Sequence, residues 1–176
     1  MSPRSWSTSC SRALAALLLI LPGCGYGLVG TARSEALRGI HRISIPIFDN
    51  ITREPGIETT ISSAVRNQFI QDGRLQVVET EVADAILEGR VKSYSLEPIS
   101  FNREDAVAQY RLRVRVEVVL RDRNRDRVVF QQDVESDRTY TVATSIALSD
   151  EARRNALDQA AAELAELLTS LVIEGF

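Results

Sequence analysis

The sequence has few of the residues on which most enzymes and metal sites depend. Its 176 residues include two cysteines and one histidine. Once Cys10 leaves with an N-terminal leader, Cys24 remains alone, so neither an intramolecular disulfide nor a thiolate metal cluster can form. His41 opens a predicted strand, where a surface histidine is far more common than a catalytic one. Because no nucleophile–base pair or phosphate-cradling glycine loop is present either, we expect neither catalysis nor a bound metal or cofactor.

Long apolar runs and an excess of positive charge are also absent. The run from Ala13 to Leu21 is much shorter than the roughly 20 residues with which a helix crosses a bilayer. Without residues 1–23, which hold two arginines and no acid, the net charge falls from −3 to −5. This charge argues against nucleic acid as a partner, since a phosphate backbone requires a net basic surface. The 44% apolar and 26% charged content is typical of one folded domain rather than of a disordered chain.

The N-terminal residues have the features of a secretory signal peptide. Arg4 and Arg12 precede the apolar run, and Leu21-Pro22-Gly23-Cys24 follows it directly. These four residues resemble the lipobox of bacterial lipoproteins, in which the cysteine thiol is acylated and becomes the first residue after cleavage. The alternative is an ordinary signal peptide followed by an incidental cysteine.

The lipobox implies how the chain is processed and held. We predict a cleaved signal peptide over residues 1–23, a lipidated N-terminus and short tether over 24–39, and a single domain over 40–176. The covalent lipid on Cys24 would be the only attached group, and it would hold the protein to the membrane without a transmembrane helix. Gly25 stands where lipoproteins retained at the inner membrane often carry aspartate, which favours the outer membrane.

The first half of the predicted domain contains a strand, a helix and a second short strand. Over residues 41–48, Ile43, Ile45 and Ile47 alternate on one face, and Pro46 indicates an edge position because proline cannot donate a ladder hydrogen bond. A helix follows with Ile57, Ile61, Val65 and Phe69 on one stripe, and Gly73 is suited to its C-cap. Residues 75–78 form the short strand.

The second half contains three strands and a C-terminal helix. Residues 85–94 place Leu87, Gly89 and Val91 on one face, and Glu88, Arg90, Lys92 and Tyr94 on the other. A loop is expected over 97–108, and the strand over 110–121 has the clearest alternation. A charged turn at 122–126 leads to its antiparallel partner over 127–140. After a linking loop over 141–148, Ser149 is the expected N-cap of a helix whose apolar stripe runs to the C-terminus.

This order predicts an α+β fold, β-α-β-β-β-β-α. Two amphipathic helices would pack on one face of a four- to five-stranded, mostly antiparallel or mixed sheet. The other face would be polar and basic, with Arg90, Lys92, Arg111, Arg113 and Arg115 on it, and Arg103 would lie in a loop beside Phe101. Guanidinium groups suit phosphate or carboxylate ligands. The alternative for this face is a solvated surface paired with Asp133 and Glu135.

Several short segments, taken in order, resemble one known family. Cys24-Gly25-Tyr26 begins the mature chain, Phe48-Asp49-Asn50-Ile51-Thr52 closes the first strand, and Pro55-Gly56-Ile57-Glu58 opens the first helix. Residues 83–89 (ADAILEG) open the middle strand, and Tyr110-Arg111-Leu112 opens the long alternating one. Together these segments resemble the lipopolysaccharide-assembly lipoprotein family LptE over nearly all of the mature chain.

The resemblance implies a non-catalytic function. Members of the LptE family are outer-membrane lipoproteins that plug the large β-barrel LptD, help it to assemble, and bind lipopolysaccharide on its way to the cell surface. We therefore expect an LptD-type barrel and lipopolysaccharide as partners, with Arg90, Lys92, Arg103, Arg111, Arg113 and Arg115 as candidate contacts and Cys24 as the lipidation site. The alternative is a periplasmic adaptor lipoprotein that docks on an envelope enzyme or a secretion channel.

Overall fold

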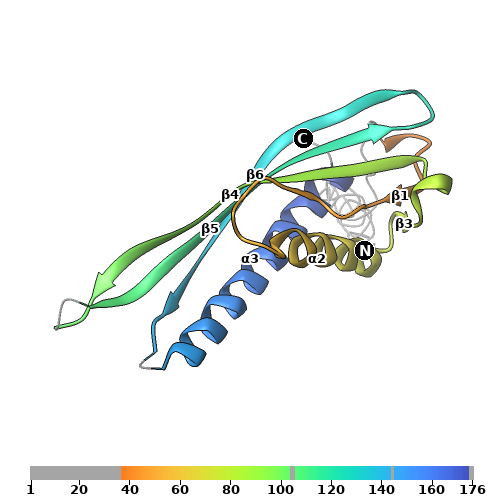
Figure 1. Ribbon diagram of the computed structural model, residues 1–176. Helices are drawn as coiled ribbons and strands as arrows, with labels where there is room; N and C mark the ends of the chain where they lie inside the picture. The colour runs from red at the N-terminus through yellow and green to blue at the C-terminus, as the bar shows by residue number, and fades with distance from the viewer. Residues whose placement is uncertain (1–36, 104–105, 144, 175–176) are drawn as a thin grey trace, which may run out of the picture. The chain divides into compact units, whose positions relative to one another are not determined.

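Three long antiparallel strands form the centre of the fold in this computed structural model (Figure 1). They are β4 (Ala85–Phe101), β5 (Val107–Asp122) and β6 (Arg127–Thr141). The alternation in β5 explains why this strand is central: every second side chain is completely buried, and these are Leu112, Val114, Val116, Val118 and Leu120. The structure describes residues 37–103, 106–143 and 145–174, which all lie in the second of two units, Arg33–Phe176.

Three short strands complete a six-stranded mixed sheet. The order is β3-β1-β4-β5-β6, in which β1 (Arg42–Ser44) pairs in parallel with both β3 (Gln76–Val77) and β4. The two-residue β2 (Asp49–Asn50) pairs in parallel with β4 further along. The predicted α+β class and order of elements are confirmed, and β2 brings the sheet beyond the four to five strands expected.

Both helices lie on the same side of the sheet, as predicted (Figure 1). Helix α2 (Ile57–Asp72) buries Ile57, Ile61, Val65 and Phe69, and it ends at Gly73, whose φ of 71° is the left-handed C-cap conformation. Helix α3 (Ile146–Glu174) packs against α2, β5 and β6. Its buried stripe includes four alanines, whose small side chains allow close packing: Ala156, Ala160, Ala161 and Ala165. No helix among the described residues is both long and apolar enough to span a bilayer.

The prediction that the first strand lies at a sheet edge was wrong. Strand β1 lies between β3 and β4 and ends before Pro46, so the proline removes no ladder hydrogen bond. Ile47 is 66% exposed instead of buried. The chain leaves the sheet here because a side chain of α2 binds its backbone: Arg66 donates a hydrogen bond to the Ile45 carbonyl at 2.6 Å. Phe48 then turns inward in place of Ile47 and is 2% exposed.

The loop expected over 97–108 is much shorter in the structure. Strand β4 continues to Phe101 and β5 already begins at Val107. Irregularities in the β4–β5 register, between Val91 and Ser93 and again between Pro98 and Phe101, break the alternation that would have indicated strand. The first of them also places Tyr94 opposite Val114 on the helix-covered face, so the prediction of Tyr94 on the polar face was wrong.

Helix α3 begins at Ile146, one turn before the expected N-cap Ser149. The Ser149 hydroxyl still satisfies a backbone group, but it does so outside the helix. Its oxygen accepts a hydrogen bond from the Ala143 N–H at 3.0 Å. Ser149 therefore holds the incoming loop against the first turn instead of capping the helix.

Candidate functional site: a charged strand face and an uncharged distal segment

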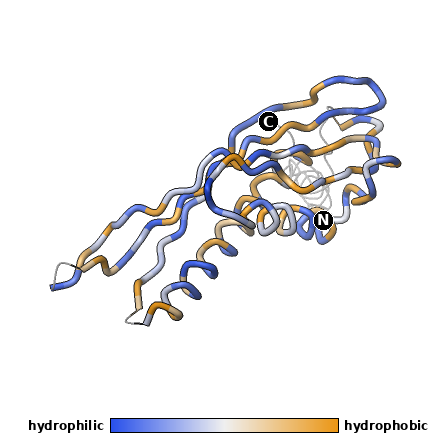
Figure 2. Tube along the Cα trace, viewed as in Figure 1, coloured by the Kyte–Doolittle hydropathy of each residue, from blue (hydrophilic) through white to orange (hydrophobic). Residues whose placement is uncertain are grey.

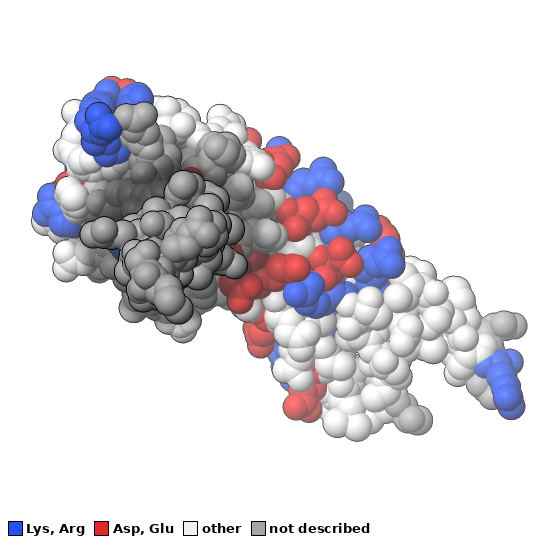
Figure 3. Space-filling view, turned by 180° about the vertical axis from the view of Figure 1, so that it is seen from behind, with Lys and Arg blue, Asp and Glu red and all other residues white. Residues whose placement is uncertain are grey.

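The sheet face opposite the helices carries five of the six predicted basic contacts. Arg90, Lys92, Arg111, Arg113 and Arg115 point away from the buried side of β4 and β5, and acidic side chains from neighbouring strands stand between them. We call this set the charge ladder: Asp49, Arg90, Lys92, Glu97, Arg111, Arg113, Arg115, Glu117, Asp133, Glu135 and Asp137. Figure 3 shows positive and negative side chains interleaved across the middle of this face.

The ladder cations already have carboxylate partners. Arg115 Nη2 lies 2.6 Å from Glu135 Oε2, and this hydrogen bond raises the pKa of Arg115. Lys92 Nζ reaches across β5 to Asp133 at 3.2 Å. Arg113 lies between two carboxylates, 3.1 Å from Glu97 and 3.1 Å from Glu135.

The remaining ladder contacts are longer. Arg111 Nε lies 3.6 Å from Asp137, and Arg90 lies 3.7 Å from Asp49 and 3.9 Å from Glu117. With five cations against six carboxylates, the face is not the free basic patch that the strand pattern predicted. The pairs include those to Asp133 and Glu135 that the alternative for this face expected, and such exposed pairs stabilise a fold only slightly.

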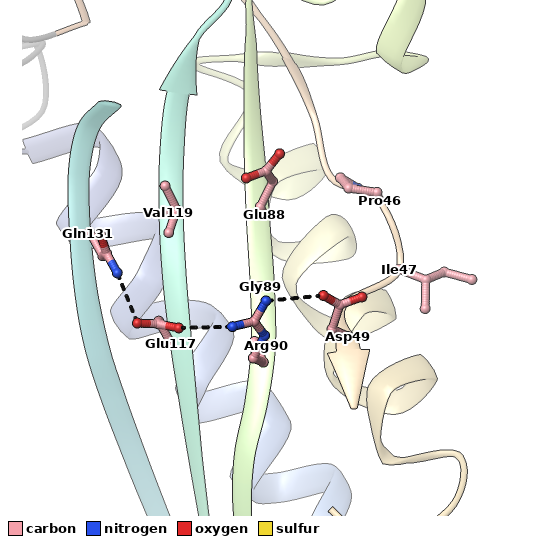
Figure 4. A pocket seen from close by; sticks show the side chains of 9 residues that line it. All are labelled: Pro46, Ile47, Asp49, Glu88, Gly89, Arg90, Glu117, Val119 and Gln131. Carbon is pink, nitrogen blue, oxygen red and sulfur yellow. Dashed lines mark hydrogen bonds and ion pairs between the residues drawn. The ribbon is translucent and has the colours of Figure 1, made fainter. Parts of the chain in front are cut away.

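A groove of about 540 Å³ opens at the end of the ladder nearest β2 (Figure 4). Arg90 lies between Asp49 and Glu117, and Gln131 donates to Glu117 at 2.9 Å. Glu88 also lines the groove, and so does the exposed Ile47. Because three carboxylates and only one guanidinium line the groove, it does not suit an anionic ligand.

The far ends of β4, β5 and β6 and the start of α3 form a second feature, an uncharged distal segment. It comprises residues 98–102, 106–110, 139–143 and 145–149, none of which is charged. Figure 3 shows uncharged surface beyond the ladder as far as the tip of the strands. Apolar side chains are exposed in it: Ile99 by 39%, Phe101 by 60%, Ile146 by 84% and Leu148 by 56%. Figure 2 shows the same apolar stretches along the trace.

Aromatic side chains connect the strands of the distal segment to each other. The Tyr110 and Tyr140 rings stack with centroids 5.7 Å apart. Tyr94 lies on the same face, where Arg153 of α3 donates to its hydroxyl at 3.5 Å and to Glu54 at 2.6 Å. Burial raises the pKa of both Tyr94 and Tyr140. The polar contact of Tyr94 with Arg153 thus joins β4 to α3.

Arg103 lies apart from the other predicted contacts. It follows β4 in the turn at the tip of the distal segment and is exposed, two residues from Phe101. Cys24, the predicted lipidation site, lies outside the described residues. The structure therefore groups five predicted residues in the ladder and leaves Arg103 with the apolar tip.

Sequence reasoning did not recognise the distal segment, although a signal was present. Four stretches of five residues each carry no charge in a chain that is 26% charged. They lie far apart in the sequence, and only the pairing of β4, β5 and β6 brings them together. Within the described residues, no group of three or more histidine, cysteine or acidic side chains could hold a metal ion.

Comparison with known proteins gives one family and several similar folds. The family model "LptE: Lipopolysaccharide-assembly" matches residues 40–171. The rare lipoprotein B of Shewanella oneidensis is 15% identical with a TM-score of 0.53, covering 74% of this chain and 93% of that one. Lipoprotein B of Nitrosomonas europaea is 16% identical with a TM-score of 0.51, covering 76% and 82%.

At these identities the solved structures show a shared fold, and the comparison with curated proteins gave no match. The family model covers about three quarters of the chain, including the whole sheet, helix α2 and most of helix α3. The chain therefore belongs to the LptE family of lipopolysaccharide-assembly proteins.

Proposed function

We propose that this protein is an outer-membrane lipoprotein, anchored through a lipid on Cys24, that takes part in lipopolysaccharide assembly without catalysing a reaction. In this proposal it binds lipopolysaccharide and plugs the lumen of an LptD-type β-barrel. Membership of the LptE family supports the general role. The observation that carries lipopolysaccharide binding is the distal segment, an exposed apolar surface with Arg103 at its tip.

Lipopolysaccharide is an amphiphile whose acyl chains lie next to phosphate groups, so its binding site needs apolar and cationic groups side by side. Phe101 and Arg103 supply an aromatic ring and a guanidinium at the tip, where Glu104 and Asp105 follow Arg103 in the sequence. Ile146 and Leu148 add apolar area at the start of α3. The ladder is less suited to the phosphates, because each of its cations would first have to leave a carboxylate partner.

The charge ladder instead suits contact with the wall of a barrel. The interior of a large outer-membrane barrel is polar and hydrated. A face of alternating charges can exchange ion pairs with such a wall at little energetic cost, since exposed pairs contribute little in either arrangement. We assign the ladder to the barrel and the distal segment to lipopolysaccharide.

Lipopolysaccharide binding is tested with the full-length lipidated protein in mild detergent. The double variant Phe101→Ala/Arg103→Gln is expected to raise the dissociation constant for purified lipopolysaccharide by about tenfold. Its thermal midpoint should be unchanged, because both side chains are exposed. Arg53→Gln and Ile70→Ala are the matched controls, being exposed residues outside the distal segment. Equal weakening by the control pair would refute a specific site.

The barrel partner is tested by gentle purification from the native outer membrane, with the co-purified proteins identified by mass. A stoichiometric large β-barrel is the expected result. Recovery of a periplasmic enzyme or a secretion channel instead would contradict the proposal and support the adaptor alternative.

A further inference from the structure

The end of the sheet opposite the distal segment carries an unusual concentration of arginine. The β5–β6 turn reads Arg121-Asp122-Arg123-Asn124-Arg125-Asp126-Arg127, and it lies against the residues at which the described chain begins. Arg125 Nη1 donates to the Arg38 carbonyl at 3.0 Å. We call the exposed arginines here the arginine end: Arg38, Arg42, Arg123, Arg125 and Arg127.

Buried carboxylates form ion pairs with several of these arginines, among them Arg42 and Arg125. Asp122 is completely buried, and its carboxylate accepts hydrogen bonds from the Asn124 and Arg125 N–H groups and from Arg125 Nη1. Asp84, whose side chain is 11% exposed, accepts from Arg42 Nη2 at 2.8 Å, while the Arg42 side chain is 46% exposed. The carboxylates therefore lie beneath the surface and the guanidinium groups on it.

Arg123 and Arg125 keep donors available for an external ligand. A guanidinium has five N–H donors. Toward the described residues, Arg123 uses only Nη1, which donates to the carbonyls of Thr80 and Ala83. Arg125 likewise uses only Nη1. Both side chains are exposed, so their remaining donors can bind phosphate oxygens. The exposed acids at this end are fewer: Glu79, Glu81 and Asp126.

Part of the arginine end lies close in the sequence to Cys24, the predicted lipid anchor. Leu37 and Arg38, where the described chain begins, lie at this end, and Leu37 is 13 positions after Cys24. A tether of this length spans at most about 45 Å. If Cys24 is lipidated, as the proposed function requires, the anchor therefore keeps this end within about 45 Å of the membrane surface.

We infer that the arginine end docks on the anionic phospholipid headgroups of the leaflet that holds the lipidated Cys24. The docked domain then directs its distal segment away from that leaflet, because the two features lie at opposite ends of β5. The inference rests on the lipid anchor of the proposed function but not on lipopolysaccharide or barrel binding.

The test uses the full-length lipidated protein in vesicles of phosphatidylcholine alone or of phosphatidylcholine with 30% phosphatidylglycerol (about one anionic lipid in three, enough for a strongly negative surface). A fluorophore is placed through Asn124→Cys in the arginine end, or through Ala106→Cys in the distal segment as a control, and a headgroup-attached quencher reports proximity to the surface. We expect quenching at position 124 only, in the anionic vesicles only, and its loss at high salt.

Arg127→Gln should lower the ratio of docked to undocked protein by about fivefold, the effect of one cation near an anionic surface. Arg154→Gln, the same change at an exposed site on α3, should leave the ratio unchanged. Quenching that is equal in neutral and anionic vesicles, or that Arg127→Gln does not reduce, would overturn the inference.

Flotation of the protein with vesicles distinguishes docking by the arginine end from anchoring by the lipid on Cys24. Protein that floats with neutral vesicles but is not quenched at position 124 in anionic ones keeps its anchor and refutes the docking. Protein that floats only with anionic vesicles contradicts lipidation and supports the arginine end. A loss of barrel co-purification by Arg127→Gln without any lipid dependence would assign this end to the barrel and refute the inference.

Discussion

At the scale of single residues, Asp84 determines how the chain enters the sheet. Its carboxylate accepts hydrogen bonds from the backbone N–H groups of His41 and Arg42, at 3.0 Å and 2.9 Å, and from the Arg42 side chain. The Arg42 hydrogen bond, together with these backbone bonds, holds the pKa of Asp84 well below its usual range. One buried side chain thus joins the start of β1 to the start of β4.

Asp84→Asn should lower the free energy of unfolding at pH 7 by roughly 1–3 kcal/mol, because charge-assisted hydrogen bonds become neutral ones. Since the folded-state pKa is depressed, the stabilisation by Asp84 is present above its unfolded pKa of about 3.9 and is lost as the pH falls below it. Urea unfolding at pH 7 and pH 3 should therefore show a smaller acid loss in Asp84→Asn than in the wild type. Asp133→Asn, an exposed change, serves as control; an equal acid loss in the wild type and Asp84→Asn would contradict this prediction.

Gly89 is required by a close approach rather than by a turn. A Cβ at this position would lie 2.4 Å from the ring of Phe48, which covers the strand. Gly89→Ala should therefore cost about 1–3 kcal/mol of stability through overpacking. Phe48→Ala is destabilising too, but the double variant should be more stable than the sum of the two changes predicts, since the second removes the clash. Additive losses of stability in the double variant would show that the Phe48 ring moves away from a Cβ at position 89 without cost.

At the scale of elements, α2 determines where the first strand stops. The Ser62 hydroxyl, on α2, accepts a hydrogen bond from the buried Phe48 N–H at 2.8 Å and donates to the Glu58 carbonyl at 2.6 Å. Arg66, one turn further along, binds the Ile45 carbonyl. A helix side chain thus replaces the sheet partner that the connection from β1 to β2 would otherwise need.

Ser62→Ala should lower the free energy of unfolding by about 1–3 kcal/mol, because the Phe48 N–H would be left buried without an acceptor. The next residue offers a matched control, since Ser63 is exposed and Ser63→Ala should change stability by less than about 0.5 kcal/mol. Chemical denaturation measures both. Equal effects of the two changes would show that the hydroxyl bond to Phe48 contributes nothing.

At the scale of the whole molecule, the described unit has two ends and a middle with different chemistry. Arginines gather at one end, paired charges occupy the middle of the polar face, and an uncharged surface occupies the other end. This distribution is consistent with three separate contacts along one protein: a leaflet, a barrel wall and an amphiphile.

A charge-swap series tests whether binding of the barrel depends on the order of positive and negative side chains in the ladder. Arg115→Glu should lower the thermal midpoint, because it faces Glu135 with a like charge, and adding Glu135→Arg should restore it in part, because Glu135 also pairs with Arg113. Co-purification with the barrel should remain weakened in the swapped protein, since the charges now face the wrong partners. Full recovery of co-purification together with stability would mean that the ladder only stabilises the sheet.

Much of the fold could be predicted from local patterns, and most of the candidate site could not. The stripe of α2 and the alternation in β5 each have one face buried and one exposed, so their periods predict their structure directly. The extension of β4 to Phe101 escaped prediction because the register shifts of the β4–β5 pair interrupt its period. The basic residues of the ladder were assigned to the correct face, but their pairing depends on β6 and β2, whose register no local pattern gives.

The sequence by itself determined the order of elements, the buried faces of α2, α3 and β5 and the polarity of the opposite sheet face, because these depend on side-chain spacing within one segment. The tertiary structure alone decided which charges meet, how four uncharged stretches form one surface, and that the arginine turn lies beside the start of the described chain. These features depend on residues far apart in the sequence: Arg38 and Arg125 are 87 positions apart. Such distances are set by the packing of the whole sheet and not by any local preference.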